Sequence, residues 1–189
     1  LCMCAKYTSW KNIYNYYFVD MTDFFNKTDL SRNDAEKIIS ETLNNCDEGE
    51  LYLENAKSES IVLDDSKIKS STYSSDLGYG LRAVTGEVVA YSHSNEISKN
   101  SLKQSADNLS STLKSKKGVY NHEIPKTNGQ FYKNINPIEE KSLQSKLELL
   151  KEVNNYTRAK SGIVQQVTAS FSGEHKSIEI IRSGGEVLT

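Results

Sequence analysis

The chain is poor in cysteine, proline and tryptophan. Its 189 residues contain three Cys, two Pro and one Trp. The cysteines are Cys2, Cys4 and Cys46, and so sparse and odd a set argues against a disulfide framework and for a reducing compartment. Cys2 and Cys4 lie too close together for the usual spacing of a zinc knuckle, and no second pair follows them. Free thiols are therefore expected.

The sequence also lacks long apolar runs and an excess of either charge. No run approaches the roughly 18 apolar residues that span a bilayer, and the mean hydropathy is -0.59. The formal net charge of -2 gives no general attraction to nucleic acid or anionic lipid, since either would need a basic face. We therefore expect a cytoplasmic protein with no nucleic-acid partner and no membrane partner.

Residues 1–29 are predicted to be a leader or upstream sequence rather than part of a domain. The chain begins with Leu1, and Met21 offers a later natural start. A signal peptide is not expected, because a long apolar centre and a small-residue cleavage site are both missing. The alternative is that the aromatic run at residues 14–19 packs on the surface of the protein.

Residues 30–117 are predicted to form an N-terminal α+β domain. Ser31 can cap a helix, and a second helix is expected to open at Asn95. The apolar residues of each helix recur at spacings of three and four, so they share one face; they are Ala35, Ile39, Leu43 and Cys46, then Leu102, Ala106, Leu109 and Leu113. Cys46 is thus expected to be a small core residue rather than a nucleophile.

Between these helices, short β-rich runs alternate with turn residues, which predicts an antiparallel meander. We expect five strands: 51–56, 60–63, 68–74, 78–84 and 87–91. Asp64 to Lys67 is expected to be a turn, and the last two strands form a hairpin about Thr85-Gly86. Every connection is short enough for sequential antiparallel pairing.

Residues 118–137 are predicted to be a linker with one possible strand at 130–132, and residues 138–189 the start of a second α+β unit. Asn136-Pro137 is a strong helix start. The expected buried face of that helix comprises Leu143, Leu147, Leu150 and Val153. A hairpin of strands 163–171 and 177–181, joined about Ser172-Gly173, is expected to follow.

Two motifs contain the residues of a known binding site but lie in a sequence context that such a site does not allow. Gly78-x-Gly80-x-x-Ala83 fits the letters of a dinucleotide-binding fingerprint, but that motif needs a buried strand before it and a helix after it. Polar residues precede it here and β-branched residues follow, so we expect the glycines to allow a bend or bulge. His122-Glu123 has no second histidine one turn later, and Pro125 would break the helix that a zinc-peptidase motif requires.

No other side chains suggest catalysis. His93 and His175 are isolated in sequence and are expected at the surface, and no nucleophile–base arrangement can be recognised among the many serines. The three Lys at 114, 116 and 117 are expected to be a solvated helix end rather than a nucleic-acid patch. The sequence therefore predicts no catalytic, cofactor-binding or metal-binding residue in this chain.

A series of short motifs runs through the predicted strands and on to the last part of the chain. They are Leu51-Tyr52-Leu53-Glu54, Glu59-Ser60, Leu63-Asp64, Ile68-Lys69, Gly78-Tyr79-Gly80-Leu81-Arg82, Gly86-Glu87, Asn95-Glu96-Ile97-Ser98 and Val167-Thr168-Ala169-Ser170-Phe171-Ser172-Gly173. In their order and spacing, the motifs up to Ser98 resemble the N-terminal region of the TldD/PmbA family of bacterial metallopeptidases, and the last motif is similar to the central region of the TldD branch. The resemblance covers roughly residues 30–189, with mild departures at Ser66 and Ala90-Tyr91.

What the resemblance implies is part of a peptidase that admits small or unfolded peptides. The zinc site of the family, an H-E-x-x-x-H helix with a distant cysteine, has no counterpart in this sequence, so zinc is implied only for a complete family enzyme. We expect a truncated fragment without activity of its own, which supplies scaffold and contacts to peptide substrate. The implied partner is the other family subunit or a catalytic half encoded downstream.

Two alternatives remain open at this stage. One is a stand-alone protein-interaction module without peptidase activity, since exposed strand edges can recruit a partner strand. The other is a modulator of DNA gyrase, a role also attached to the family, to which the slightly acidic charge balance gives no electrostatic support.

Overall fold

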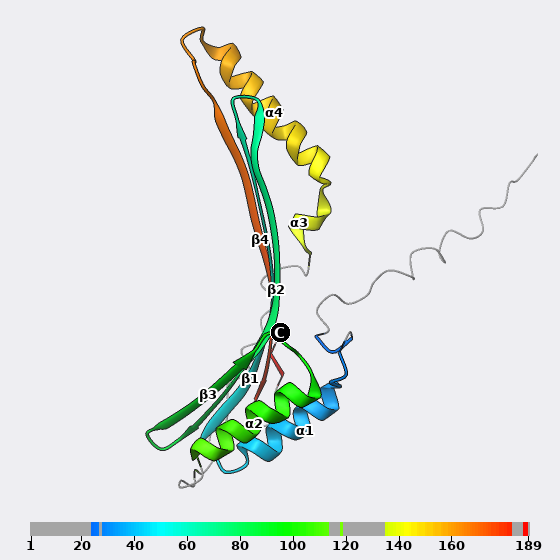
Figure 1. Cartoon of the computed structure of the whole chain (residues 1–189), viewed down its shortest axis with the longest axis vertical. Coiled ribbons are helices and arrows are strands. Elements are labelled where there is room, and N and C mark those ends of the chain that lie inside the picture. The colour runs from blue at the N-terminus through cyan, green and yellow to red at the C-terminus, as the bar shows by residue number, and fades with distance from the viewer. Residues whose placement is uncertain (1–23, 27, 114–117, 119–134, 183–186, 189) are drawn as a thin grey trace, which may run out of the picture.

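A computed structural model describes residues 24–26, 28–113, 118, 135–182 and 187–188. Its strands form one antiparallel sheet in the order β3-β2-β1-β4-β5, with helices beside it (Figure 1). The predicted class, an α+β fold with an antiparallel meander flanked by helices, is confirmed. The elements are α1 Arg32–Leu43, β1 Glu48–Asp64, β2 Lys67–Thr85, β3 Val88–Ser94, α2 Lys99–Leu113, α3 Pro137–Glu140, α4 Leu143–Lys160, β4 Thr168–Arg182 and β5 Val187–Leu188.

The strands are fewer and longer than the sequence predicts. The two runs at 51–56 and 60–63 belong to the single strand β1, and those at 68–74 and 78–84 belong to β2. The polar residues 55–59 do not form a turn, because β1 is bonded on both sides, to β2 and to β4, along this stretch. Pairing with two neighbours outweighs the weak strand propensity of Asn, Lys and Ser.

The predicted hairpin about Ser172-Gly173 is also wrong, since Gly173 lies inside the continuous strand β4 and pairs with Glu59. The single helix predicted from Asn136 is two helices. Asn136 caps the short α3 as expected, but Lys141 is extended and the side chain of Ser142 starts α4 as a new N-cap. Of its predicted apolar face, Leu150 is buried, whereas Leu143 and Val153 are exposed.

The other local predictions in the N-terminal part agree with the structure. Ser31 caps α1 by accepting a hydrogen bond from the Asp34 amide, and Cys46 is buried in the core. α2 begins after Ser98 rather than at Asn95, and all four of its predicted apolar residues are buried. Gly86 adopts a positive φ in the β2–β3 turn, as expected for a tight hairpin.

Several predictions lie outside the described residues. They are residues 1–23 and 27 of the leader 1–29, with Cys2 and Cys4, then His122, the possible strand 130–132, and the lysines at 114, 116 and 117. The predicted domain boundaries at 29, 117 and 137 remain predictions. The unit that follows residue 137 shares its sheet with the first unit, because β4 pairs with β1 from Asp64 to Glu50.

The four helices of the described residues lie on one face of the sheet (Figure 1). The odd-numbered residues of β1 face them: Leu51 and Leu53 enter the core beneath α1 and α2, and Ile61 and Leu63 enter the core beneath α4. The register between β1 and β4 is unbroken over this length, so these residues share one side of the pleat. The sheet bends at its middle and the helices lie on the outer side of the bend (Figure 1).

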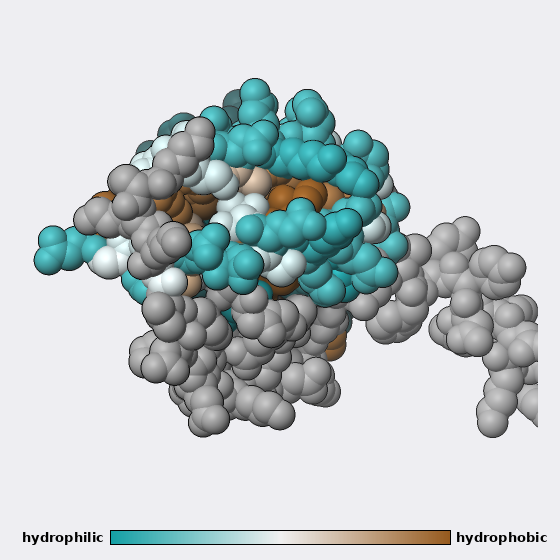
Figure 2. All heavy atoms as spheres, turned by 90° about the horizontal axis from the view of Figure 1, so that it is seen from below, coloured by the Kyte–Doolittle hydropathy of each residue, from teal (hydrophilic) through white to brown (hydrophobic). Residues whose placement is uncertain are grey.

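The two cores differ greatly in size. Twenty buried residues form the larger one, from α1, α2, the adjoining strand ends and the segments beside the helices, including Phe24 and Phe25 before α1. Ile61, Leu63, Leu150 and Ala169 form the smaller one. Seen from below, the end of the molecule shows hydrophobic side chains bordered by hydrophilic ones (Figure 2). Among the described residues, no helix is long and apolar enough to cross a membrane.

A buried ion pair joins the first helix to the last long strand. The Arg32 guanidinium donates to both carboxylate oxygens of Glu179, at 2.5 and 2.9 Å. The Glu179 side chain is 2% exposed and that of Arg32 40%. Removing one partner of a buried pair is costly because it leaves an uncompensated charge. This contact therefore ties α1 to β4.

We predict that Arg32→Ala lowers the free energy of unfolding by about 3 kcal/mol. Chemical denaturation followed by circular dichroism measures this loss. Lys37→Ala is the control, because Lys37 belongs to an exposed pair with Glu41 on the same helix and should cost no more than about 0.5 kcal/mol. Equal losses for the two variants would contradict the role of the buried pair.

Asp64, the last residue of β1, links the neighbouring strands at the end of the sheet remote from α1 and α2. Its carboxylate accepts hydrogen bonds from Gln166 and Thr168, at 2.9 and 2.8 Å, and lies 3.7 Å from the Lys69 ammonium. These hydrogen bonds first, and the Lys69 charge next, lower the pKa of Asp64 below its ordinary value of 3.8. A carboxyl group with a lowered pKa stabilises the fold above its unfolded pKa and loses that contribution as the pH falls through the folded pKa.

We predict that Asp64→Asn reduces thermal stability at pH 7 and that the difference from the parent chain disappears as the pH falls below about 4. Thermal melts from pH 7 to pH 2 measure this convergence. A gap that persists unchanged at pH 2 would instead indicate a loss independent of the carboxylate charge.

Candidate interaction surface

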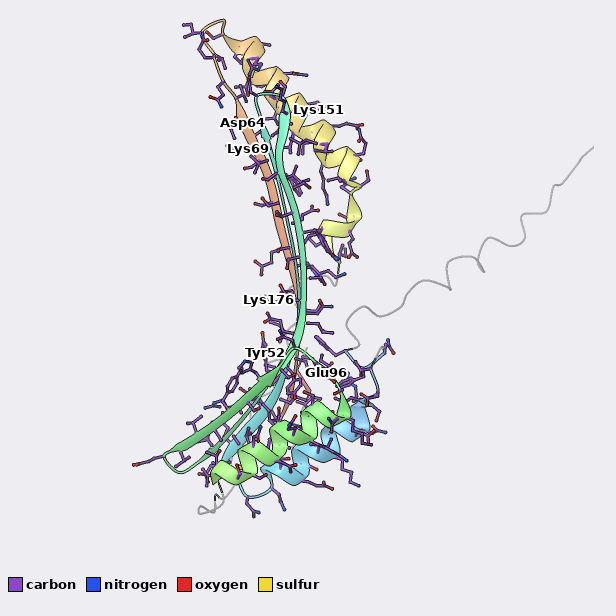
Figure 3. The ribbon with its side chains drawn as sticks, viewed as in Figure 1. Tyr52, Asp64, Lys69, Glu96, Lys151 and Lys176 are labelled. Atoms are coloured by element: carbon purple, nitrogen blue, oxygen red, sulfur yellow. The ribbon has the colours of Figure 1, made fainter. Side chains whose placement is uncertain are left out.

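The side of the sheet opposite the helices carries no described element. We call it the open face; it consists of the even-numbered residues of β1 and their cross-strand neighbours. Tyr52 and Lys176 project from this side, whereas Lys151 of α4 and Glu96 before α2 lie on the helical side (Figure 3). Because the helices lie outside the bend, the open face lies on its inner side.

The half of the open face behind α1 and α2 is rich in aromatic and aliphatic side chains. We call this region the aromatic patch. Cross-strand pairing places its members side by side on four strands: Arg82 beside Tyr91, Tyr52 beside Ile180, and Ile178 one row further along. Tyr91 is 64% exposed, Val89 58% and Ile178 37%. The members are Tyr52, Arg82, Val89, Tyr91, Ile178 and Ile180.

Charges of both signs alternate across this patch. Arg82 lies 3.3 Å from the Glu48 carboxylate, and Arg182 lies 4.0 Å from that of Glu50. At the next turn of the pleat, the Lys176 ammonium lies 3.6 Å from Glu54. Each of these charges is thus already paired within the sheet. A partner that covered the patch would therefore not bury any of them without an opposite charge beside it.

Tyr52 is held in a fixed position. Its hydroxyl donates to Glu54 Oε2 at 2.5 Å. Burial, followed by this hydrogen bond and the Glu54 charge, raises the pKa of Tyr52 to about 12. The phenol therefore stays neutral at physiological pH and donates rather than acts as a base.

Gly78 and Gly80 lie where neighbouring groups approach the backbone of β2 closely. A Cβ on Gly80 would come within 2.6 Å of the Tyr91 hydroxyl, so the Tyr91 ring occupies the space above this glycine. Tyr91 also stacks on His93, with ring centroids 5.8 Å apart. A Cβ on Gly78 would meet the Ser94 carbonyl at 2.8 Å. Both glycines lie within a strand, as predicted, but the expected bulge is not at these positions, because their pairing with β1 is regular and the register shift lies at Val62–Leu63. They are positions that permit close approach of neighbouring groups.

The second surface feature is a long strand edge. β3 pairs with β2 only from Tyr79 to Thr85, so among the described residues Lys67 to Gly78 of β2 has no neighbour on its outer side. Residues 67–76 are exposed, including Ile68 and Tyr73. Such an edge presents alternate N–H and C=O groups to a further strand.

The isolated residues that the sequence offers do not come together as a metal site. His93 pairs with Gly80 on the open face, whereas His175 pairs with Lys57 on the helical face. Cys46 is 3% exposed in the core. The described residues contain no group of three His, Cys, Asp or Glu side chains able to hold a metal ion, and so they do not fit the zinc that the resemblance implies for a complete enzyme.

Sequence reasoning missed the aromatic patch. From the sequence, Tyr52, Arg82 and Tyr91 could be identified only as members of predicted strands or of motifs compared with the family. Period-two alternation could place Tyr52 opposite Leu51 and Leu53, but it cannot show that four strands bring Tyr91, Arg82 and Ile180 beside it.

Residues 49–113 match the family model described as PmbA/TldA metallopeptidase domain 1. The chain is 34% identical over 144 residues to a metalloprotease TldD homolog of Buchnera aphidicola subsp. Acyrthosiphon pisum, a match that covers 76% of this chain and 30% of that protein. It is 32% identical over 147 residues to the Haemophilus influenzae homolog, covering 75% of this chain and 30% of that protein. The chain thus spans about 30% of the length of these relatives.

Solved structures share the fold. TldE from Thermococcus kodakarensis superposes with a TM-score of 0.55 at 13% identity, over 82% of this chain and 35% of that one. A candidate modulator of DNA gyrase from Bacteroides thetaiotaomicron superposes with a TM-score of 0.56 at 16% identity, over 81% of this chain and 36% of that one. At such low identity the likeness concerns the fold alone. The domain match and the curated relatives together show that the chain belongs to the TldD/PmbA family.

Proposed function

We propose that this chain is the N-terminal scaffold portion of a TldD-type metallopeptidase that acts on small or unfolded peptides. It would supply contacts to substrate and to a partner, namely the other family subunit or a separately encoded catalytic half, and the partner would supply the zinc site. The observation that carries the proposal is the match of residues 49–113 to the first domain of the family, together with relatives named as metalloproteases.

The exposed edge of β2 supports the contact role. An extended peptide can add to an unpaired strand by main-chain hydrogen bonds, which need little from the peptide's side chains. The edge at Ser70 to Ser75 carries mostly small hydroxyl residues, so bulky groups do not shield its backbone. This suits a substrate class defined by extended conformation rather than by sequence.

We predict that the purified chain with added zinc does not hydrolyse an unstructured peptide, because the described residues offer no metal-binding group. Mass spectrometry of a casein-derived peptide after incubation measures cleavage. The same assay with a full-length family relative is the positive control. Zinc-dependent turnover by this chain alone, abolished by a chelator, would refute the non-catalytic role.

We predict that the β2 edge binds an extended peptide, and that one of two neighbouring proline substitutions removes binding without unfolding the chain. Adjacent strand residues point their N–H groups to opposite sides. Of Ser71→Pro and Thr72→Pro, one therefore removes an outward donor and the other breaks a bond to β1. Fluorescence anisotropy with a labelled unstructured peptide measures binding, and thermal melts identify the variant that remains folded.

The folded variant should bind the peptide at least about fivefold more weakly, the effect of about one lost hydrogen bond. The destabilised variant serves as the matched control for the effect of proline itself. Unchanged peptide affinity in the folded variant would remove the edge from the proposal and leave the family assignment intact.

A further inference from the structure

We infer that the aromatic patch on the inner side of the bend is the surface on which a further domain of a full-length TldD/PmbA chain docks. The occupant is the polypeptide that makes up the remaining 70% or so of the relatives' length, since this chain covers 30% of them. The inference rests on the proposed scaffold function. It adds to that function by identifying the surface of this chain that contacts the rest of a full-length family member.

The composition of the patch is that of a protein interface rather than of a solvated sheet face. Buried interface centres are enriched in aromatic residues and Arg, and here Tyr91 and Arg82 are cross-strand neighbours, as are Tyr52 and Ile180. A solvated face would instead carry mainly small polar residues with few large apolar or aromatic side chains. The other half of the same open face shows that pattern, with Ser58, Ser60, Ser70, Thr72 and Ser172.

The ion pairs within the patch favour a protein partner of mixed charge. Arg82 with Glu48 and Arg182 with Glu50 present cations and anions in alternation. A polyanion such as nucleic acid would be repelled by the carboxylates of Glu48 and Glu50, whereas a polar–apolar protein surface can pair with both signs.

The size of the patch favours a covalently joined domain over a second copy. Four strands at about 4.8 Å spacing and six residues at about 3.3 Å rise give roughly 400 Å² in projection. A stable complex between separate chains needs about 800 Å² on each partner. Domains of one chain meet through interfaces that total about 600 to 1,500 Å², because the linker supplies a high effective concentration.

The position of the patch agrees with this reading. It lies on the inner side of the bend, and the helices occupy the outer side (Figures 1 and 3). A domain seated there would contact four strands at once and would leave both helical layers exposed. The exposed stripe of Leu149, Val153 and Tyr156 belongs to α4 on the outer side of the bend, so a domain docked on the inner side would not cover it, which makes it a suitable control.

The test compares thiol reactivity at two equally exposed tyrosines. Tyr91 is 64% and Tyr156 65% exposed, so Tyr91→Cys and Tyr156→Cys should be alkylated at similar rates in the isolated chain. Both are made in a chain with Cys2→Ser and Cys4→Ser. Each is then placed in a chimera in which this chain replaces the matched part of the Haemophilus influenzae homolog, and maleimide labelling is followed by mass spectrometry.

In the chimera the Tyr91→Cys thiol should react at least about tenfold more slowly than in the isolated chain, and the Tyr156→Cys thiol within about twofold of its isolated rate, since alkylation follows thiol exposure. Cys46, 3% exposed, reports folding because it stays unlabelled only in the folded chain. If the chimera does not fold, the same rates are measured with the rest of the homolog co-expressed as a separate chain.

Four results would overturn the inference. One is an unchanged rate at Tyr91→Cys in the folded chimera, and another is equal protection at both positions. The third is protection of Tyr91→Cys in the isolated chain that grows with protein concentration, which would identify a second copy as the occupant. Failure to obtain either a folded chimera or a co-purifying complex counts against it as well. Labelling does not depend on peptidase activity, so the experiment distinguishes failure of this inference from failure of the proposed function.

Discussion

The fold depends on the central strand β1, which is hydrogen-bonded on both sides along most of its 17 residues. The two neighbouring strands form hydrogen bonds with backbone N–H and C=O groups of β1 that would otherwise need water as a partner. The polar middle of the strand can therefore remain extended. Because β1 is continuous, the larger core beneath α1 and α2 and the smaller core beneath α4 share one rigid element. Without it, the chain would consist of two small units.

The middle of the sheet is held by polar contacts instead of a core. On the helical face of β1 the order is Leu51 and Leu53, then Asn55, Lys57 and Glu59, then Ile61 and Leu63. Lys57 pairs with Glu139 of α3, and Glu59 pairs with the buried Lys146 of α4. The Lys146 ammonium also donates to the Ile138 carbonyl and lies over the Phe171 ring. These contacts fix α3 and α4 on the sheet where apolar burial is slight.

One-sided coverage follows from the same arrangement. All four helices lie on the face of the odd-numbered β1 residues, and the opposite face presents a Tyr- and Arg-bearing half and a Ser- and Thr-bearing half. An antiparallel sheet can keep one face in water, but exposed tyrosine, valine and isoleucine together are typical of a surface that meets another protein. The proposed scaffold role gives a physical reason for this asymmetry.

The sequence alone determined the helices α1 and α2, their buried faces, the burial of Cys46 and the hairpin at Gly86, because each rests on local capping, periodicity or turn chemistry. It also carried the family resemblance, and its context predicted that Gly78 and Gly80 lie in a strand, which they do. Only the tertiary structure decided that the polar runs at 55–59 and 172–173 are strand interior, because their partners lie more than a hundred residues apart in sequence. The aromatic patch depends on the same long-range pairing for Ile178 and Ile180. Strand alternation assigns Tyr52 to a face, but only the register of four strands brings Ile180 beside it and Tyr91 over Gly80, the partner of Tyr52 on β2.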